Sequence, residues 1–275
     1  MTQVIEKIDN EIYNLEKVFI PTMGALHDGH ISLINDAKKL NLPIVVSIFV
    51  NPKQFNDKND FKNYPRNIIN DIEILTSLQV DFVLTPKSDY VYERNKYSKI
   101  SSGHIGTLFE GKFRPGHFDG VLTVVKRLFE IVNPNTAIFG AKDAQQLFLI
   151  KQMVKDHNLK ITILEGSTVR EKNGLAMSSR NQLLSNTGKE QAKKIYQNLL
   201  YVSKLFLKTK DFSFAIEEGL EKYKASNLKV DYLEVVNKET FNIPDENTKE
   251  LLFLTAAYVD NIRLIDNLKV ELWQK

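Results

Sequence analysis

The sequence predicts an α/β protein, with a Rossmann-like doubly wound parallel sheet followed by a smaller C-terminal α+β domain. Three observations lead to this fold class. Strand-like apolar runs alternate with segments of helical periodicity from residue 17 to residue 164. Residues 44–50 (IVVSIFV) form a near-continuous, largely β-branched run, which is typical of a strand covered on both faces. After residue 180 the alternation gives way to two helical segments followed by three strand-like runs.

The first domain is expected to span residues 1–180. Residues 1–14 carry apolar side chains at helical spacing and lack the apolar core of a signal peptide. Ile31, Ile34 and Ala37 recur at the spacing of one buried helix face. Strands are expected at 17–21, 44–50, 81–84, 136–139 and 161–164, and helices at 29–40, 68–78, 121–132 and 144–157. In such a sheet, ligands bind beyond the carboxyl ends of the strands.

The second domain is expected to span residues 181–275 and to close the active-site cleft. Helices are expected at 189–207 and 213–225, and strands at 230–236, 251–259 and 262–268. Asp260-Asn261 is a plausible hairpin turn between the last two strands. Because the connection between the domains is short, we expect them to pack together with the cleft between them.

The composition excludes several classes of protein. Of the 275 residues, 37 are basic and 34 acidic, so the formal charge of +3 gives no electrostatic case for a nucleic-acid or membrane partner. There is no cysteine, which excludes disulfides, thiolate catalysis and Cys-ligated zinc. The longest apolar stretch, residues 42–50, is far shorter than the roughly 20 residues that cross a bilayer. We expect a cytoplasmic protein.

Residues 21–30 (PTMGALHDGH) carry the strongest chemical signal, at the junction of the first strand and the first helix. His27 and His30 are three residues apart and so share one helix face. Gly24 and Gly29 allow a ligand to approach the backbone, and a helix N-terminus attracts phosphate. The two imidazoles could donate hydrogen bonds to a phosphate in a transition state. The alternatives are a helix cap beside a half-buried histidine, or a zinc site completed by one of the other histidines, which are His104, His117 and His157.

Two later segments carry groups that suit a triphosphate. Lys142, in FGAKDAQQ, follows an expected strand and can reach phosphates, while Asp143 can cap the next helix or help to hold Mg²⁺. Ser178, Ser179 and Arg180, in MSSRN, offer two hydroxyls and a guanidinium. The alternatives are a solvated surface lysine and a Ser-rich turn before a helix.

Residues 21–34 (PTMGALHDGHISLI) resemble the nucleotide-binding signature of the pantothenate synthetases. This family belongs to the HxGH nucleotidyltransferase group, together with the class I aminoacyl-tRNA synthetases. Further segments match the family in order: NPKQF, DFKNYPR, RPGHFDGVLTVV, FGAKDAQQL, VREKNGLAMSSRN and LLFLTAAYVDNIRLIDN. The resemblance therefore covers nearly the whole chain.

The resemblance implies an ATP-dependent ligase that condenses pantoate and β-alanine to pantothenate, releasing AMP and pyrophosphate through a pantoyl-adenylate. It implies ATP with Mg²⁺, the small molecules pantoate and β-alanine as partners, and a homodimer. His30, a proton donor in the family, His27 and Lys142 are the expected catalytic residues, and no metal ligand is assigned. Gln54 and Gln146 are expected to bind pantoate. The expected ATP-binding residues are Met23, Gly24, Ala25, Leu26, His27, Asp28, Gly29, His30, Gly140, Ala141, Lys142, Asp143, Val169, Met177, Ser178, Ser179 and Arg180.

The chain departs from the family at three positions in these segments. Ala141 stands where the family usually has Glu, and Ala144 stands where it usually has an aromatic residue. Asp28 replaces the commoner Glu and keeps its charge. Beside Ala141, Gly140 is expected to allow a tight exit from its strand.

Three other functions compete with the ligase. Gln54 and Gln146 argue against a different HxGH nucleotidyltransferase, whose product would be a stable adenylylated compound. The balanced charge argues against a shortened aminoacyl-tRNA synthetase, which needs a basic face. The phosphate-handling groups argue against a non-catalytic ligand-binding module, which would tolerate their loss.

Overall fold

Two compact units make up the protein, for which the computed structural model describes residues 1–93 and 96–272. The first unit comprises Met1–Ala141 and Gln146–Ser167, and the second comprises Lys142–Gln145 and Thr168–Lys275. Residues 168–180 therefore pack with the second unit, although the sequence placed them in the first domain. That the second domain closes a cleft stays a prediction. No described helix combines the length and the apolar character that crossing a membrane requires.

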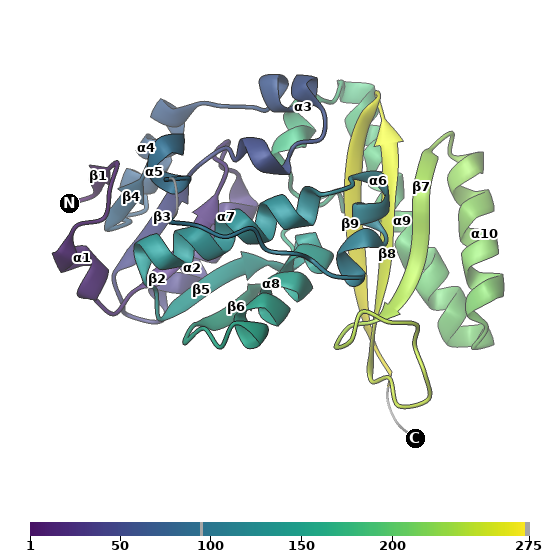
Figure 1. Ribbon diagram of the computed structural model, residues 1–275. Helices are drawn as coiled ribbons and strands as arrows, with labels where there is room; N and C mark the ends of the chain where they lie inside the picture. The colour runs from purple at the N-terminus through teal and green to yellow at the C-terminus, as the bar shows by residue number, and fades with distance from the viewer. Residues whose placement is uncertain (94–95, 273–275) are drawn as a thin grey trace. The chain divides into compact units, whose positions relative to one another are not determined.

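A six-stranded parallel sheet organises the first unit, in the order β1-β4-β3-β2-β5-β6 (Figure 1). All its neighbouring strands run parallel, as the sequence predicts. The strands are β1 (Gln3–Ile5), β2 (Val18–Thr22), β3 (Ile44–Ile48), β4 (Phe82–Leu84), β5 (Thr136–Gly140) and β6 (Thr162–Gly166). The helices are α1 (Asn10–Asn14), α2 (Asp28–Lys38), α3 (Lys58–Asn63), α4 (Ile68–Ser77), α5 (Ser88–Val91), α6 (Glu110–Phe113), α7 (His117–Val132) and α8 (Ala144–Asp156).

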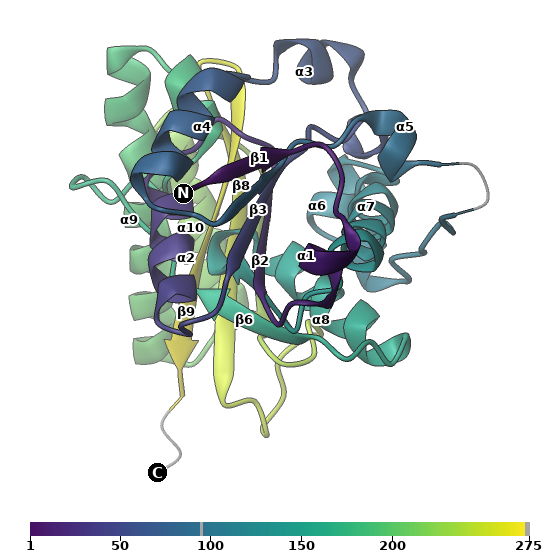
Figure 2. The same cartoon turned by 90° about the vertical axis from the view of Figure 1, so that its left-hand side faces the viewer.

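Helices cover both faces of this sheet (Figure 2). Val18 and Ile20 of β2 are buried in one cluster with side chains of α2 and α4. Phe19, which lies between them, is buried in another cluster with side chains of α7 and α8. The residues of β3 divide between the two clusters in the same alternating way. Two buried faces explain why these strands read as continuous apolar runs.

The edge strand at the N-terminus was not expected from the sequence. Residues 1–14 have apolar side chains at helical spacing, but Gln3–Ile5 form the edge strand β1 and pair in parallel with β4. Only Asn10–Asn14 are helical. Tertiary pairing with a neighbouring strand therefore overrides the local helical pattern. Helices α3, α5 and α6 were not expected either, because none of them is long enough to show a helical period.

The second unit is an antiparallel three-stranded sheet, β7-β8-β9, with two helices packed against one face (Figure 1). Its elements are α9 (Asn186–Thr209), α10 (Phe212–Ala225), β7 (Lys229–Asn237), β8 (Glu250–Val259) and β9 (Ile262–Glu271). Asp260 and Asn261 have φ angles of 51° and 62°, as both central residues of a type I′ hairpin turn require. The expected turn between the last two strands is thus confirmed.

A buried lysine precedes β2 in the first unit. Lys17 is 0% exposed. Its ammonium group donates to three carbonyl oxygens, which belong to Leu15 (2.6 Å), Tyr13 (3.0 Å) and Asn133 (3.1 Å). Burial lowers the pKa of Lys17 below its ordinary value of 10.5. The unfolded chain therefore binds more protons than the folded chain in a window just below that pH.

This lowered pKa predicts a stability that depends on pH. As the pH rises through the folded pKa toward 10.5, the contribution of Lys17 to the free energy of unfolding should increase. Urea unfolding of the wild type and of Lys17→Met, from neutral pH upward, measures this contribution. The stability of the wild type relative to the variant should rise across the window. A fall would mean that the three carbonyl oxygens stabilise the ammonium by more than burial destabilises it.

Candidate active site

The carboxyl ends of three neighbouring strands gather the chemical segments of the first unit. β3, β2 and β5 lie side by side and run parallel, so their carboxyl ends share one edge of the sheet. Residues 23–30, 51–54 and 140–141 leave the sheet at this edge. Strand order reverses between β2 and β5, which makes this the switch point where open α/β sheets bind ligands.

A buried carboxylate stabilises the turn after β2. Gly24 and Ala25 both have positive φ angles, 79° and 50°. Asp71 of α4 is 1% exposed and accepts the backbone N–H groups of Ala25 and Leu26, each at 2.8 Å. A Cβ on residue 24 would lie 2.7 Å from a carboxylate oxygen of Asp71. Glycine is therefore required here both for its backbone conformation and for this close approach.

His27 and His30 lie against each other at the N-terminus of α2, with ring centroids 4.1 Å apart. Nδ1 of His27 accepts the backbone N–H of Gly29 at 3.1 Å, and Nδ1 of His30 accepts the backbone N–H of His27 at 3.3 Å. Because a backbone N–H can only donate, each ring carries its proton on Nε2. His27 is therefore a helix cap, and the N–H donor of each ring is at Nε2.

The loop after β3 is organised by a buried amide of known orientation. Oδ1 of Asn51 accepts the backbone N–H of Lys53 at 3.1 Å and the Tyr92 hydroxyl at 2.5 Å. Burial raises the pKa of Tyr92, so this phenol stays protonated and donates. Nδ2 of Asn51 therefore donates to the Gly120 carbonyl at 3.1 Å and to Oε1 of Gln54 at 3.0 Å. Gln54 must turn its side-chain oxygen toward Asn51.

Gln54 consequently directs its amide nitrogen the other way. Nε2 lies 3.0 Å from Sδ of Met23, a weak acceptor in the turn after β2. The main-chain oxygen of Gln54 lies 2.7 Å from Nδ1 of His117, at the start of α7. Nη1 of Arg114, which can only donate, lies 3.1 Å from Nε2 of His117, so Nε2 accepts. Nδ1 of His117 therefore carries the proton and donates to the main-chain oxygen of Gln54. Gln54 is therefore fixed through both its side chain and its main chain, with N–H donors available.

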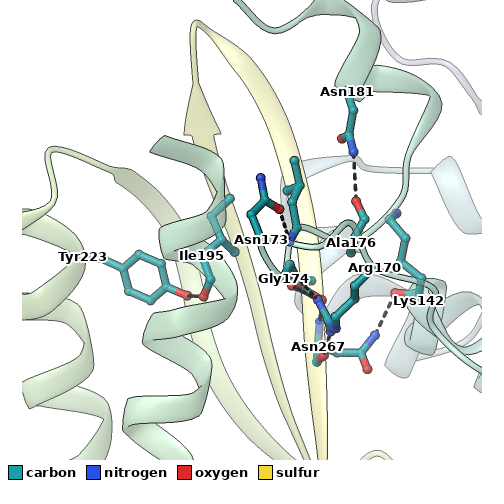
Figure 3. Close-up of polar contacts among 11 residues, drawn as sticks. Lys142, Arg170, Asn173, Gly174, Ala176, Asn181, Ile195, Tyr223 and Asn267 are labelled. Carbon is teal, nitrogen blue, oxygen red and sulfur yellow. Dashed lines mark hydrogen bonds and ion pairs between the residues drawn. The ribbon is translucent and has the colours of Figure 1, made fainter. Parts of the chain in front are cut away.

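Lys142 and Asp143 lie in a 3₁₀ turn directly after β5 and belong to the second unit. Nζ of Lys142 is 3.5 Å from Oδ1 of Asp143. The main-chain carbonyl oxygen of Lys142 accepts from Nδ2 of Asn267 at 2.8 Å (Figure 3). A Cβ on Gly140 would meet no atom within 4 Å, and its φ is not left-handed, so the expected tight exit does not require glycine there. Gln146 lies half-buried in the first turn of α8.

Residues 169–177 form a closed hairpin in the second unit. The backbone N–H of Met177 donates to the carbonyl of Val169 at 2.9 Å, next to an antiparallel bridge. Ser178 caps the 3₁₀ turn Ser179–Leu183, because its hydroxyl accepts the backbone N–H of Arg180 at 3.3 Å. Val169 and Met177 therefore pair across one hairpin, and the rest of MSSRN follows that hairpin directly in the chain.

The structure places the expected site residues in two groups, one in each unit. The first unit carries Met23, Gly24, Ala25, Leu26, His27, Asp28, Gly29, His30, Gln54, Gly140, Ala141 and Gln146. The second carries Lys142, Asp143, Val169, Met177, Ser178, Ser179 and Arg180. Within residues 1–93 and 96–272, no three acidic or histidine side chains are grouped to hold a metal ion. The meeting of the two groups around one nucleotide stays a prediction.

The sequence does not point to all the residues that hold the candidate site residues in place. Asp71 had a signal, because it occupies the apolar face of its helix, three residues after Ile68 and four before Leu75. Asn51 and His117 had no such signal. Each acts through groups far along the chain, and only the folded structure shows those contacts.

The chain is similar to proteins of one family over almost its whole length. A family model described as pantoate-beta-alanine ligase matches residues 1–269. The pantothenate synthetase of Aliivibrio salmonicida is 44% identical over 257 residues, which cover 92% of this chain and 86% of that protein. The pantothenate synthetase of Caldicellulosiruptor bescii is 41% identical over 273 residues, which cover 98% of this chain and 96% of that protein.

Solved structures show the same likeness. Pantothenate synthetase from Thermus thermophilus superposes with a TM-score of 0.90 at 35% identity, covering 97% of this chain and 98% of that one. Pantoate-β-alanine ligase from Francisella tularensis, complexed with β-γ ATP and β-alanine, superposes with a TM-score of 0.80 at 38% identity. That match covers 98% of this chain and 97% of the other.

Proposed function

The chain belongs to the pantoate–β-alanine ligase family, and we propose how its residues carry out the reaction of that family. It is a ligase that forms pantothenate from pantoate and β-alanine. A free carboxylate does not readily form an amide, because oxide is a poor leaving group. In the proposed route the pantoate carboxylate attacks the α-phosphorus of ATP, and pyrophosphate leaves. The β-alanine amine then attacks the acyl carbon, and AMP leaves.

The paired imidazole donors are the observation that carries this proposal. His27 and His30 hold their Nδ1 atoms on backbone N–H groups, which leaves the proton of each ring on Nε2. The rings lie at the positive end of α2, where phosphate binds favourably. As charge grows on the phosphate oxygens, these donors stabilise it without first having to reorient. The role of His30 in this proposal is electrostatic, and its Nε2–H also suits the proton donation that the resemblance implies.

The triphosphate is the proposed ligand of the second group of residues. Ser178 and Ser179 supply hydroxyls, and Arg180 supplies a guanidinium that can fork onto phosphate oxygens. Lys142 adds a point charge, and its side chain is 18% exposed. Mg²⁺ binds through one or two carboxylates when phosphates and water complete its shell, and Asp143 fits because its side chain is 46% exposed beside Lys142. Bound there, the ion would screen phosphate charge.

Pantoate is the proposed ligand of the two glutamines. Gln54 presents N–H donors, because its oxygen is already committed to Asn51. Such donors pair with the oxygens of a carboxylate or a hydroxyl, and pantoate carries both kinds of group. Gln146, in the first turn of α8, is the second proposed amide. A site that hydrogen-bonds hydroxyls discriminates strongly against analogues that lack them, because its polar groups are then left unpaired.

Asn51→Asp tests the orientation of Gln54 directly. The variant has the same shape but places an oxygen where Nδ2 donates to Gly120 and Gln54. Gln54 would then turn its nitrogen toward residue 51 and its oxygen toward pantoate. We expect KM for pantoate to rise by roughly 10–100-fold, since an unpaired polar group costs about 1–3 kcal/mol. KM for ATP should change much less. An unaltered KM for pantoate would show that Asn51 does not determine the orientation of the Gln54 side-chain amide.

Two further properties belong to the proposal. The resemblance favours a homodimer, and light scattering of the purified protein measures its mass in solution. The composition, with no cysteine, suits a cytoplasmic location.

Exchange of labelled pyrophosphate into ATP is the test of the adenylate route. With pantoate present and β-alanine absent, the protein should catalyse exchange, because forming the adenylate is reversible. Exchange should stop when pantoate is omitted. Pantothenate formation without any pantoate-dependent exchange would contradict the proposed intermediate. A stable adenylylated product in place of an amide would favour the rival nucleotidyltransferase.

A further inference from the structure

A buried ion pair in the second unit joins β9 to the hairpin of residues 169–177. The Arg170 guanidinium forks onto the Asp266 carboxylate, with Nη1 at 2.7 Å from Oδ2 and Nη2 at 2.8 Å from Oδ1. The Asp266 side chain is only 3% exposed, and that of Arg170 is 17% exposed. A third bond comes from the main-chain N–H of Asn267, which donates to Oδ1 of Asp266 at 2.7 Å.

Arg170 also fixes the hairpin itself. Its Nη1 donates to the carbonyl of Gly174 at 3.1 Å, across the hairpin turn (Figure 3). Its guanidinium lies 3.7 Å from the ring centroid of Tyr196 in α9, so it is held between a carboxylate and an aromatic face. The Arg170 side chain therefore anchors the hairpin to β9 through directed bonds.

Asn267 connects the same strand to the lysine turn. Its carbonyl oxygen accepts from Nη2 of Arg170 at 3.0 Å, and its Nδ2 donates to the carbonyl of Lys142 at 2.8 Å (Figure 3). Successive residues of a strand point to opposite faces. Asp266 lies on the face that carries Leu264 and Leu268, and Asn267 reaches Lys142 from the other face.

We infer that Asp266 and Asn267 are positioning residues for adenylate formation. Together they fix Lys142 and the hairpin at one separation, so that the lysine and the MSSRN groups meet one triphosphate in a set geometry. Neither residue touches ATP in this assignment. The inference rests on the proposed function, because it needs Lys142 and the hairpin to bind phosphates. Through Asp266 and Asn267, two segments that are distant in the chain act as one site.

The position of Asp266 supports a role beyond stability. Its neighbours on that face of β9, Leu264 and Leu268, pack in the apolar core. Apolar side chains at both residue 266 and residue 170 would avoid the desolvation of two charged groups, and such replacements of whole buried ion pairs are often neutral or stabilising. What an apolar residue cannot supply is a pair of directed bonds that orient Arg170.

The experiment measures kcat/KM for ATP by pantoate-dependent pyrophosphate exchange. Asn267→Ala and the isosteric Asn267→Asp both remove the donor to Lys142, and we expect a loss of about tenfold or more, since small misplacements far from the reacting atoms are costly. Asp266→Asn should lose activity as well. The matched control is Asp231→Asn, which breaks an ion pair of the same sheet, 2.7 Å from Arg263, that does not involve Arg170 or Lys142. The control should retain wild-type kcat/KM.

A double-mutant cycle separates positioning from simple loss of structure. In a Lys142→Ala background, Asn267→Ala should reduce exchange much less than it does in the wild type, because its effect acts through that lysine. Equal losses in both backgrounds would overturn the inference, and so would wild-type kcat/KM in both Asn267 variants. Loss of exchange in the Asp231→Asn control, matching that of Asp266→Asn, would also overturn it. Absence of exchange in the wild type would instead overturn the proposed adenylate route.

Discussion

His30→Ala should slow pantoate-dependent pyrophosphate exchange by about 10²–10³-fold, which is the usual cost of removing one preorganised donor. The structure gives the reason. Nδ1 of His30 accepts the backbone N–H of His27, so its Nε2–H is already oriented before any substrate binds. Alanine removes that donor, and a water molecule in its place would have to reorient as charge develops. Exchange rates at saturating ATP and pantoate measure the loss.

His30→Gln is the informative companion, because a glutamine can place an N–H donor near the position of Nε2. It should recover part of the activity that His30→Ala loses. His27→Ala should lose activity and also some stability, since it removes the cap of α2, which typically contributes about 1 kcal/mol. An exchange rate in His30→Ala equal to that of the wild type would refute the role assigned to this residue.

Asp71→Ala should have the second large effect, on both stability and ATP binding. It leaves two buried backbone N–H groups, those of Ala25 and Leu26, without their carboxylate. Bonds to charged groups contribute about 1.5–3 kcal/mol each, so we expect the free energy of unfolding to fall by about 3 kcal/mol or more. The turn that carries Gly24 would also lose its support, so the dissociation constant for ATP should rise. Urea unfolding and calorimetric titration with ATP measure the two effects.

Two variants control for general damage. Asp71→Asn keeps the size and one acceptor oxygen, so its losses should be intermediate. Asp81→Ala removes a carboxylate that accepts the backbone N–H of Ile44 at 2.8 Å, at the opposite end of β3 from the site. It should lower stability somewhat and leave ATP binding unchanged. ATP binding unaffected by Asp71→Ala would mean that the turn keeps its shape without this carboxylate.

The sequence predicts the longer elements of this fold well, and physical reasons separate them from the rest. In residues 44–50 and in α2, burial pattern and periodicity agree, so local and tertiary preferences coincide. The final hairpin is predictable because Asp and Asn tolerate the left-handed backbone of its turn. β1 was not predictable, because its three residues are a strand only by virtue of pairing with β4.

The candidate site likewise has parts that the sequence predicts and parts that it does not. Its strand–turn–helix segments are local, so the glycine turn and the histidine pair could be predicted from residues 21–30 alone. The groups that set their geometry are remote in sequence, as Asp71 is from Ala25 and Asn267 is from Lys142. No local pattern encodes such pairs. The tautomers of the histidines and the orientation of Gln54 likewise follow only from the donors that surround them.

The most direct test of the central claim is a crystal structure with a non-hydrolysable ATP analogue and pantoate. The claim is that residues from both units hold a single triphosphate. We predict Nε2 of His27 and His30 within about 2.7–3.2 Å of phosphate oxygens, and Lys142 and Arg180 on the same triphosphate at similar distances. A triphosphate held by one group alone, with the imidazoles turned away from phosphorus, would contradict the account.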